Sequence, residues 1–433
     1  MNERRAWKWA ALAVVLAAAA GCAHEVVLKP TPEFGNPVAD VRSDADEPLL
    51  AGFAKEAITP HRPALMAGFG LFRVSVGAHD DLFVRTLVVK QGSEKLALVA
   101  VDCIGLQRTD VMAIKAAVAG FRPDQVLIAS THTHSGPDTI GLWGLPPYVS
   151  GQDQRFMQSI KQAVVNTIAR ADAAAEPAAV LSAVYPMDPA IMINANAGEP
   201  KDDTMGIMVF RDGQGRAVAT LVNVAGHAES MWSNNRVLTA DYPGVICREV
   251  EKNYGGGAIF FNGALGAMIT PNLPQSSKGR SWETMEDIGE RVFREVERGM
   301  DLLVKDEKPA IAHRQSLVLF PMKNEQYLYL SKTGLLNRDS YVGENIITEV
   351  NVIEIGSAQF VTFPGEAYPK LGMKVRARQK PLSFQIGLAA DELGYIIAPP
   401  DYGSDLYEYE TSMCAGPDLA GDIEQELGRL LAE

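Results

Sequence analysis

Short apolar runs that alternate with segments of helical spacing set the hydrophobic pattern of this chain. Residues 84–90, 95–101 and 125–129 are rich in aliphatic and β-branched side chains, which is typical of buried strands. Residues 110–119, between the last two runs, have the spacing of a helix. A strand–helix–strand unit of this kind implies two parallel strands joined by a right-handed crossover. The pattern therefore predicts an α/β fold.

The same alternation continues to the end of the chain. Asp212 and Gly213 predict a hairpin turn, and the tyrosine-rich residues 321–347 are expected to form either an irregular rim over a cleft or a surface hairpin. We find no internal repeat and no clear interdomain linker, so we expect a mixed β-sheet core flanked by helices in a single large catalytic domain. Further strands are predicted at 178–185, 205–210, 217–224, 257–261, 310–320, 347–355, 359–363 and 384–388, and helices at 154–173, 241–253, 282–304, 369–378 and 419–431.

The N-terminus carries a targeting signal. Arg4, Arg5 and Lys8 precede an apolar run that is too short to span a bilayer and that ends in Ala-Ala-Gly-Cys at Cys22. This ending resembles a bacterial lipobox, which implies that Cys22 is the acylated first residue of the mature protein. By the same resemblance, Ala23 implies an outer-membrane lipoprotein, and several acyl chains give stable membrane anchoring. The alternative is an ordinary secretory signal cut at small residues.

These features divide the chain into three parts. Residues 1–22 are predicted to be a lipoprotein signal peptide. Residues 23–48 are polar and end in an acidic run, which favours a tether, although a strand that docks on the domain is the alternative. Residues 49–433 are predicted to form the catalytic domain.

Composition excludes one class of partner. The 433 residues are 47% hydrophobic and 21% charged, with a net charge of −13 and no cluster of basic residues. Nucleic-acid binding is therefore not expected. The chain has no Cys-x-x-Cys pair, and Cys103, Cys247 and Cys414 are expected to be buried apolar residues.

Candidate chemistry lies at the ends of predicted strands. His132 and His134 follow the strand at 125–129, but their imidazoles can share one site only if a bend breaks the alternation of side chains. Otherwise the pair belongs to an ordinary strand-end loop. His227 and Glu366 follow two other strands, and nitrogen ligands with one carboxylate are what a catalytic zinc requires. Asp102, also at a strand end, is either a site partner or a loop anchor.

Several of these segments together resemble the neutral/alkaline non-lysosomal ceramidases. The resemblance covers residues 50–415, and its order and rough separations match that family. It rests on Thr131-His132-Thr133-His134-Ser135-Gly136-Pro137, His227-Ala228-Glu229-Ser230-Met231, Pro364-Gly365-Glu366, Gly394-Tyr395 and Tyr407-Glu408, and Gly77-Ala78-His79-Asp80 resembles an early loop of the family.

The resemblance implies roles for individual residues. Zinc would be held by His132, His227, Glu366 and Tyr407, the last chosen over Tyr409 from its spacing to later hydroxyl residues. His134 would contact the substrate carbonyl or the oxyanion, with Tyr395 as a second candidate. Substrate-binding or ligand-orienting roles are expected for His79, Asp102, Glu229 and Asp241.

One loop departs from the family pattern. The family's Gly-Asp-Val-Ser-Pro-Asn appears here as residues 266–272, with Ala267 in place of the acidic residue and Thr270 in place of the serine. Thr270 is therefore a candidate catalytic hydroxyl, and the altered loop is the reason to consider substrates other than ceramide.

The leading hypothesis is a zinc-dependent hydrolase of the amide bond in a lipid-like substrate such as N-acyl sphingosine. The first alternative is a metal hydrolase of another N-acyl or cell-wall substrate. The second is a surface lipoprotein that binds without catalysis.

Overall fold

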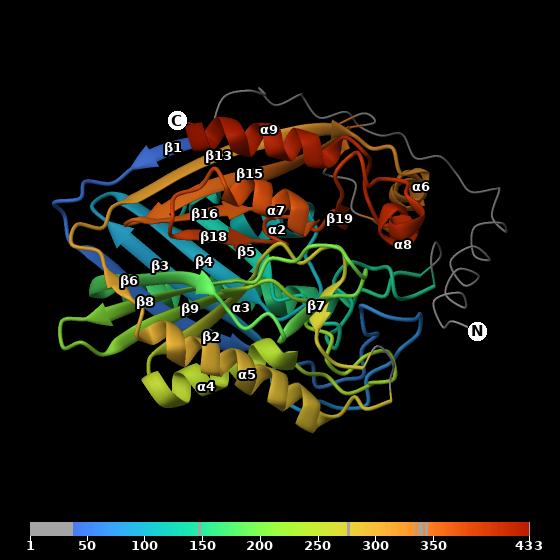
Figure 1. The fold of residues 1–433 in the computed structure, drawn as a ribbon, viewed down its shortest axis with the longest axis horizontal. Coiled ribbons are helices and arrows are strands. Elements are labelled where there is room, and N and C mark those ends of the chain that lie inside the picture. The colour runs from blue at the N-terminus through green and yellow to red at the C-terminus, as the bar shows by residue number, and fades with distance from the viewer. Residues whose placement is uncertain are drawn as a thin grey trace.

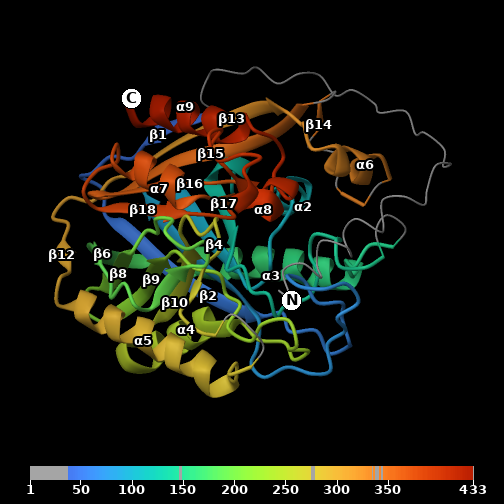
Figure 2. The ribbon, with the colours of Figure 1, turned by 45° about the vertical axis from the view of Figure 1, so that its right-hand side comes forward.

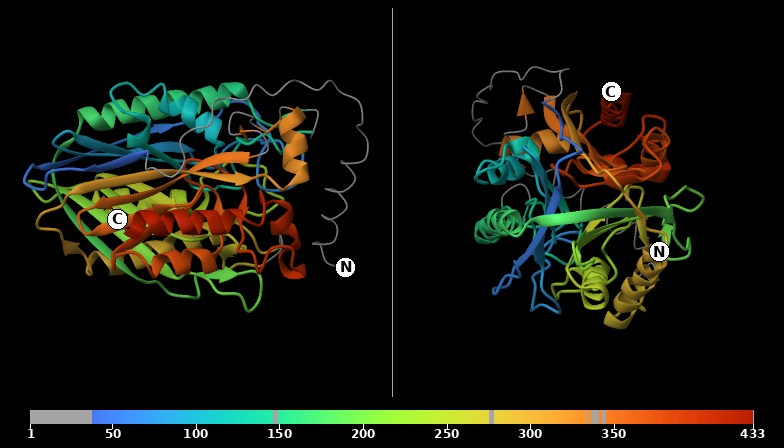
Figure 3. Two further views of the ribbon diagram at one scale, coloured as in Figure 1. Left: turned by 90° about the horizontal axis from the view of Figure 1, so that it is seen from above. Right: turned by 90° about the vertical axis from the view of Figure 1, so that its left-hand side faces the viewer.

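The computed structural model describes residues 38–145, 149–274, 278–333, 335–336, 341–342 and 345–432. Within them, two β-sheets stack face to face and helices cover both outer faces (Figure 1). The turned views show the same helix–sheet–sheet–helix order (Figures 2 and 3). This confirms the predicted mixed α/β single domain. Cys22 and most of the predicted tether lie outside the described residues.

The larger sheet is mixed. Its strands are β2 (Leu49–Ala57), β3 (Phe83–Gln91), β4 (Glu94–Val101), β5 (Val126–Ser130), β6 (Glu176–Pro186), β8 (Thr204–Asp212), β9 (Ala217–Val224), β10 (Gly257–Asn262) and β12 (Val304–Lys305). The order is β10-β9-β8-β6-β2-β3-β4-β5, with β12 beside β6. The parallel β4–β5 pair and the antiparallel β8–β9 hairpin are both as predicted.

The second sheet is formed by one N-terminal strand and by strands from residue 311 onward. It contains β1 (Ala39–Arg42), β13 (Ile311–Pro321), β14 (Tyr341–Val342), β15 (Asn345–Ile355), β16 (Ala358–Thr362) and β18 (Ser383–Ile386). Two short pairs complete the strands: β7 (Met192–Asn194) with β11 (Ile269–Pro271), and β17 (Glu366–Ala367) with β19 (Tyr395–Ile396). In the second sheet β1 pairs with β13, so this part of the predicted tether is a docked strand.

Helices cover the outer faces because each has one apolar side. Those on the larger sheet are α2 (Arg108–Lys115), α3 (Gln154–Ala173), α4 (Asp241–Tyr254) and α5 (Trp282–Met300), and those on the second sheet are α7 (Pro369–Arg376) and α9 (Leu419–Ala432). The 3-10 turns are η1 (Pro123–Gln125) and η3 (Asp405–Tyr407), and α8 spans Glu408–Ser412. Asp153 caps α3 and Ser281 caps α5, which fixes where these two helices begin.

Two predictions of local structure were wrong. Residues 321–347 were expected to form an irregular rim or a surface hairpin, but their first part forms the helix α6 (Glu325–Thr333), and their last part pairs as antiparallel strands, β14 with β15. The helix predicted at 282–304 ends at Met300, and Val304 joins the larger sheet. In both places pairing or packing with distant segments outweighs the local pattern.

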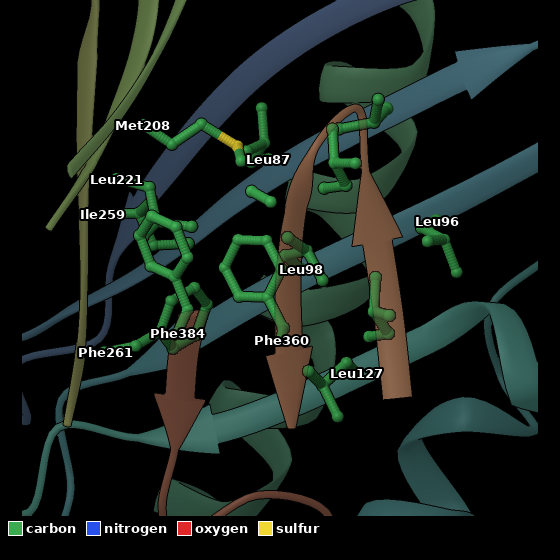
Figure 4. Close-up of a cluster of buried hydrophobic side chains, with 14 of the residues drawn as sticks. Leu87, Leu96, Leu98, Leu127, Met208, Leu221, Ile259, Phe261, Phe360 and Phe384 are labelled. Carbon is green, nitrogen blue, oxygen red and sulfur yellow. The ribbon is translucent and has the colours of Figure 1, made fainter. Parts of the chain in front are cut away.

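The main core lies between the two sheets (Figure 4). Leu98 and Leu221 of the larger sheet face Phe360 and Phe384 of the second, whose rings stack with centroids 4.5 Å apart. Burial of each such side chain stabilises the fold by roughly 1.5–3 kcal/mol. A Cβ at Gly206 would lie 2.5 Å from the Phe384 ring, so the close approach of the sheets requires glycine there.

Two further expectations concern single features. Cys103, Cys247 and Cys414 are buried free thiols, as predicted. Among the helices of the described ranges, none is long and apolar enough to cross a membrane.

Candidate active site

A bend after β5 brings His132 and His134 to one place. His132 adopts a left-handed backbone conformation (φ 64°), which breaks the alternation of side chains. Its Nδ1 donates to the Ile104 carbonyl at 2.6 Å, so Nε2 points to the site. The Nε2 atoms of His132 and His134 lie 3.1 Å apart. The sequence allowed the two imidazoles to share a site only if a bend broke the alternation of side chains, and this bend is present.

The segment after β9 delivers His227 beside them. Thr133 and Ala228 form a parallel bridge, so the continuations of β5 and β9 run side by side. His227 Nδ1 donates to the Ile269 carbonyl at 2.7 Å. Its Nε2 lies 2.9 Å from Glu366 Oε2, while Glu366 Oε1 lies 3.7 Å from His132 Nε2. Three chain segments thus converge on one point.

The donor set fits a divalent metal. Ligand atoms of His132, His134 and His227 all lie within 4.8 Å of one another, and all three residues are buried. A carbonyl can only accept, so the Nδ1 atoms of His132 and His227 carry a proton, and Nε2 is the nitrogen that each ring can offer to a metal. Imidazole nitrogens with one carboxylate are suitable ligands for zinc. The geometry places His134 within the same group, beyond the ligand set that the resemblance implied.

Burial and neighbouring charge shape the protonation of these groups. Burial lowers the pKa of His132 to about 4, and burial followed by the neighbouring histidines lowers the pKa of His134 well below its usual value. Burial also lowers the pKa of His227, but its hydrogen bond to Glu366 and that carboxylate's charge outweigh this and raise it. Burial alone would raise the pKa of Glu366, but His132 and His227 together lower it. The lowered pKa values keep the rings of His132 and His134 neutral at neutral pH, whereas the raised pKa of His227 reflects its close contact with Glu366.

A loop that departs from the family pattern supports His227. Ala267 and Met268 adopt left-handed conformations (φ 56° and 60°), which are strained for residues with a side chain. This turn places the Ile269 carbonyl on His227. Thr270 is 1% exposed, and its hydroxyl has no hydrogen-bond partner in the described part of the chain.

Glu229 lies behind His134 with both carboxylate oxygens unpaired among the described residues. The residue is 1% exposed, and its Oε2 lies 3.9 Å from His134 Nδ1, which also has no hydrogen-bond partner there. Burial raises the pKa of Glu229, although His227 and the Thr270 hydroxyl act in the opposite direction. Unpaired buried polar atoms are costly, so a group of them beside a cavity indicates a functional site.

The sequence left Asp102 as either a site partner or a loop anchor, and its contacts are those of a loop anchor. Its Oδ2 accepts from Arg85 Nη1 and from the Phe83 backbone N–H, each at 2.8 Å. Its Oδ1 accepts from the Thr131 hydroxyl at 3.1 Å, so the anchor holds the residue next to His132. Asp102 therefore belongs to the support of the site.

The other two candidate polar residues make structural contacts. Asp241 begins α4, accepts from the Ser230 N–H at 2.9 Å, and has its pKa raised by burial to about 6. His79 stacks on Trp282 with ring centroids 4.1 Å apart and contacts Asp80 at 3.0 Å. No contact of either residue with the histidine group is found among the described residues.

The two neighbouring tyrosines differ in their surroundings. The Tyr407 hydroxyl donates to Glu199 at 2.5 Å and lies outside the cavity lining. Tyr409 lines the cavity beside the histidines, and burial of its hydroxyl followed by the Glu366 charge raises its pKa, although the residue as a whole is 56% exposed. Both belong to Tyr-Glu pairs, so sequence spacing could not separate them.

The cavity next to the histidines is largely apolar. Its wall includes Tyr395, whose hydroxyl donates to the Met268 sulfur at 3.4 Å, and Glu392, whose pKa is raised by burial and then by the Glu366 charge. Other lining side chains are Ile104, Ile140, Leu142, Trp143, Leu336 and Leu393. The predicted aromatic rim contributes Tyr327 from α6.

Arg73 is a supporting residue that no sequence pattern indicated. It is 7% exposed, lies over the Phe69 ring, and donates through Nη2 to the carbonyls of Ala67 and His134. Burial lowers the pKa of Arg73 to about 10. It therefore fixes the backbone of His134.

No family model matches this chain, and no curated protein matches it. Two solved structures share its fold. A neutral ceramidase from Pseudomonas aeruginosa has a TM-score of 0.73 and 19% identity, covering 89% of this chain and 74% of that one. A ceramidase complexed with C2 has a TM-score of 0.72 and 17% identity, covering 89% and 75%. The chain therefore has the neutral ceramidase fold that its sequence resemblance implied.

Proposed function

We propose that this protein is a metal-dependent hydrolase that cleaves the amide bond of a ceramide-type N-acyl lipid. The observation that carries the proposal is the convergence of His132, His227 and Glu366 from three chain segments beside an apolar cavity. Shared fold with two proteins described as ceramidases favours this bond and this substrate class. The apolar lining suits a lipid chain.

His132, His227 and Glu366 are the proposed metal ligands, with the hydroxyl of Tyr409 in place of Tyr407. Nitrogen and carboxylate donors make zinc the proposed metal. When bound, zinc polarises a carbonyl group and lowers the pKa of a water molecule.

His134 is the proposed proton carrier. Its buried ring is neutral, so Nε2 can accept a proton and pass it to the leaving amine. The Glu229 carboxylate, 3.9 Å from Nδ1, stabilises the imidazolium that forms.

Tyr395, in the wall of the cavity, is placed to stabilise developing charge on the substrate oxygen. The hydroxyl of Tyr395 donates a hydrogen bond to the Met268 sulfur. Sulfur is a weak acceptor, so a substrate oxygen can replace it. Each well-placed donor contributes roughly 3–4 kcal/mol to the transition state. The buried Thr270 hydroxyl is assigned to positioning, through Glu229.

The test combines metal analysis with substrate hydrolysis. We expect purified protein to carry about one equivalent of metal and to release fatty acid from N-acyl sphingosine. His132→Ala should lose both, while His61→Ala, at an exposed loop histidine, should keep both. Protein that hydrolyses N-acyl sphingosine equally well after His132→Ala contradicts the proposal.

A substrate panel tests the alternatives, which the altered loop at Ala267 and Thr270 favours. Faster hydrolysis of short N-acyl amides or cell-wall amides would point to the other metal hydrolase. Tight binding of N-acyl sphingosine without turnover in zinc-replete buffer would point to a binding lipoprotein.

We also propose that acylation of Cys22 anchors the protein in the outer membrane, which rests on the lipobox resemblance. Labelled palmitate should enter the wild type and not Cys22→Ala, and only the wild type should fractionate with outer membranes. Equal labelling of both contradicts the anchor.

A further inference from the structure

Glu392 places a carboxyl group in the wall of the cavity, close to the proposed metal ligands. Its Oε1 accepts from the Gly394 N–H at 3.0 Å. Its Oε2 is buried and has no hydrogen-bond partner in the described part of the chain. The mechanism proposed above does not use this group. One face of the carboxyl group is therefore held by the protein and the other is left for a ligand.

The surrounding backbone is built around this side chain. A Cβ at Gly105 would lie 2.5 Å from Glu392 Cγ and 2.9 Å from its Cβ, so only glycine leaves room for it. Gly394, which holds Oε1, has a φ of 76°, a conformation that favours glycine. The preceding Asp391 is fixed by the Arg108 N–H and the Thr348 hydroxyl. Glu392 is thus held in one position before any ligand binds.

The cavity wall contains both polar and apolar side chains, but among the described residues none of its polar groups hydrogen-bonds Glu392 Oε2. Ile104, Ile140, Leu393 and Ile346 line the same cavity, and none of these side chains can hydrogen-bond. A buried polar atom without a partner is unfavourable in such surroundings. The free-energy cost of leaving this oxygen unpaired is offset when a ligand hydrogen-bonds to it.

We propose that Glu392 is a specificity-determining residue that hydrogen-bonds a hydroxyl group carried by the amine portion of the substrate, near the amide bond. This inference rests on the proposed amide hydrolysis. It predicts a preference for N-acyl amino alcohols over N-acyl alkylamines of equal size. A site built to bind a hydroxyl group strongly rejects the analogue that lacks it.

The test compares N-acyl sphingosine with its 1-deoxy and 3-deoxy analogues. We expect the wild type to lose about 100-fold or more in kcat/KM with the analogue that lacks the contacted hydroxyl. Glu392→Leu should hydrolyse that analogue as well as the wild type does and discriminate by less than about 3-fold. Glu392→Gln should keep the preference, and Gly105→Ala, which displaces the side chain, should lose it. Glu290→Gln, at an exposed helix position, is the matched control.

A second measurement separates this inference from the proposed function. Calorimetric binding of sphingosine and its two deoxy analogues should show the same preference in the wild type and its loss in Glu392→Leu. Absence of hydrolysis with every substrate would contradict the proposed function, and the binding series would still decide the role of Glu392. Equal binding and equal hydrolysis of all three compounds by the wild type would overturn the inference, as would an unchanged preference in Glu392→Leu.

Discussion

Asp102 and Glu229 are buried carboxyl groups close to the histidine group, and they differ in their partners. Asp102 accepts three hydrogen bonds, including one from the buried guanidinium of Arg85. Glu229 accepts none by either oxygen among the described residues. A fully paired group holds the backbone in place, whereas an unpaired one is free to act on a ligand or on His134. Asp102 therefore supports the structure of the site, whereas Glu229 is available for its chemistry.

The largest expected effect on stability comes from removing the fully hydrogen-bonded carboxyl group of Asp102. Asp102→Ala leaves Arg85, which is 5% exposed, without its carboxylate and should lower the free energy of unfolding by about 3–5 kcal/mol. Urea unfolding measures this loss. Asp124→Ala removes the partner of the half-exposed Arg122 and should cost at most about 1 kcal/mol. Equal losses in the two variants would contradict the assignment of Asp102 as an anchor.

Asp391 extends the comparison to a carboxyl group that is paired only with neutral donors. It is 3% exposed, and burial raises its pKa to about 7 despite those hydrogen bonds. The unfolded chain releases this proton near pH 4 and the folded chain does not, so stability should fall by about 2–4 kcal/mol as the pH rises from 4 to 7. Urea unfolding at a series of pH values should show this slope, and Asp391→Asn should flatten it. An unchanged slope in the variant would assign the effect to other groups.

Glu229→Gln removes the charge of the carboxyl group that has no hydrogen-bond partner and keeps the shape of the side chain. Turnover should fall by about 10- to 100-fold, because the His134 imidazolium loses its counter-charge. The free energy of unfolding should stay the same or rise slightly, since a buried charge without a partner is removed. Steady-state kinetics and urea unfolding check the two parts. A large loss of stability would place Glu229 with Asp102 as a structural residue.

The two tyrosines repeat the comparison on a smaller scale. Tyr409→Phe removes a hydroxyl from the cavity wall beside the histidines and should lower kcat by about 10-fold or more, because it is a proposed metal ligand. Tyr407→Phe removes the hydroxyl that donates to Glu199 and should cost about 1 kcal/mol of stability with turnover nearly unchanged. Kinetics and thermal unfolding of the pair measure both effects. The reverse outcome would restore Tyr407 as the metal ligand.

Local sequence was sufficient for elements that carry their own boundaries. The helix predicted at 154–173 and the strand at 217–224 have those bounds in the structure. Asp153 caps the start of the helix, and a Gly-containing turn directly precedes the strand in its hairpin with β8. In both elements the residues that mark the boundary lie within a few positions of it. The docked strand β1 was only an alternative interpretation, because its pairing partner β13 lies more than 260 residues away.

The sequence by itself determined the α/β class and the segments that converge, because strand periodicity and the His-Thr-His-Ser-Gly-Pro segment are local features. Only the tertiary structure decided which polar groups are paired. It placed Tyr409 rather than Tyr407 at the cavity and showed Asp102 to be an anchor. Among the described residues, it left both oxygens of Glu229 and the Oε2 atom of Glu392 without hydrogen-bond partners. The physical reason is that a hydrogen bond depends on atoms brought together from distant segments, and residue spacing along the chain carries no information about that meeting.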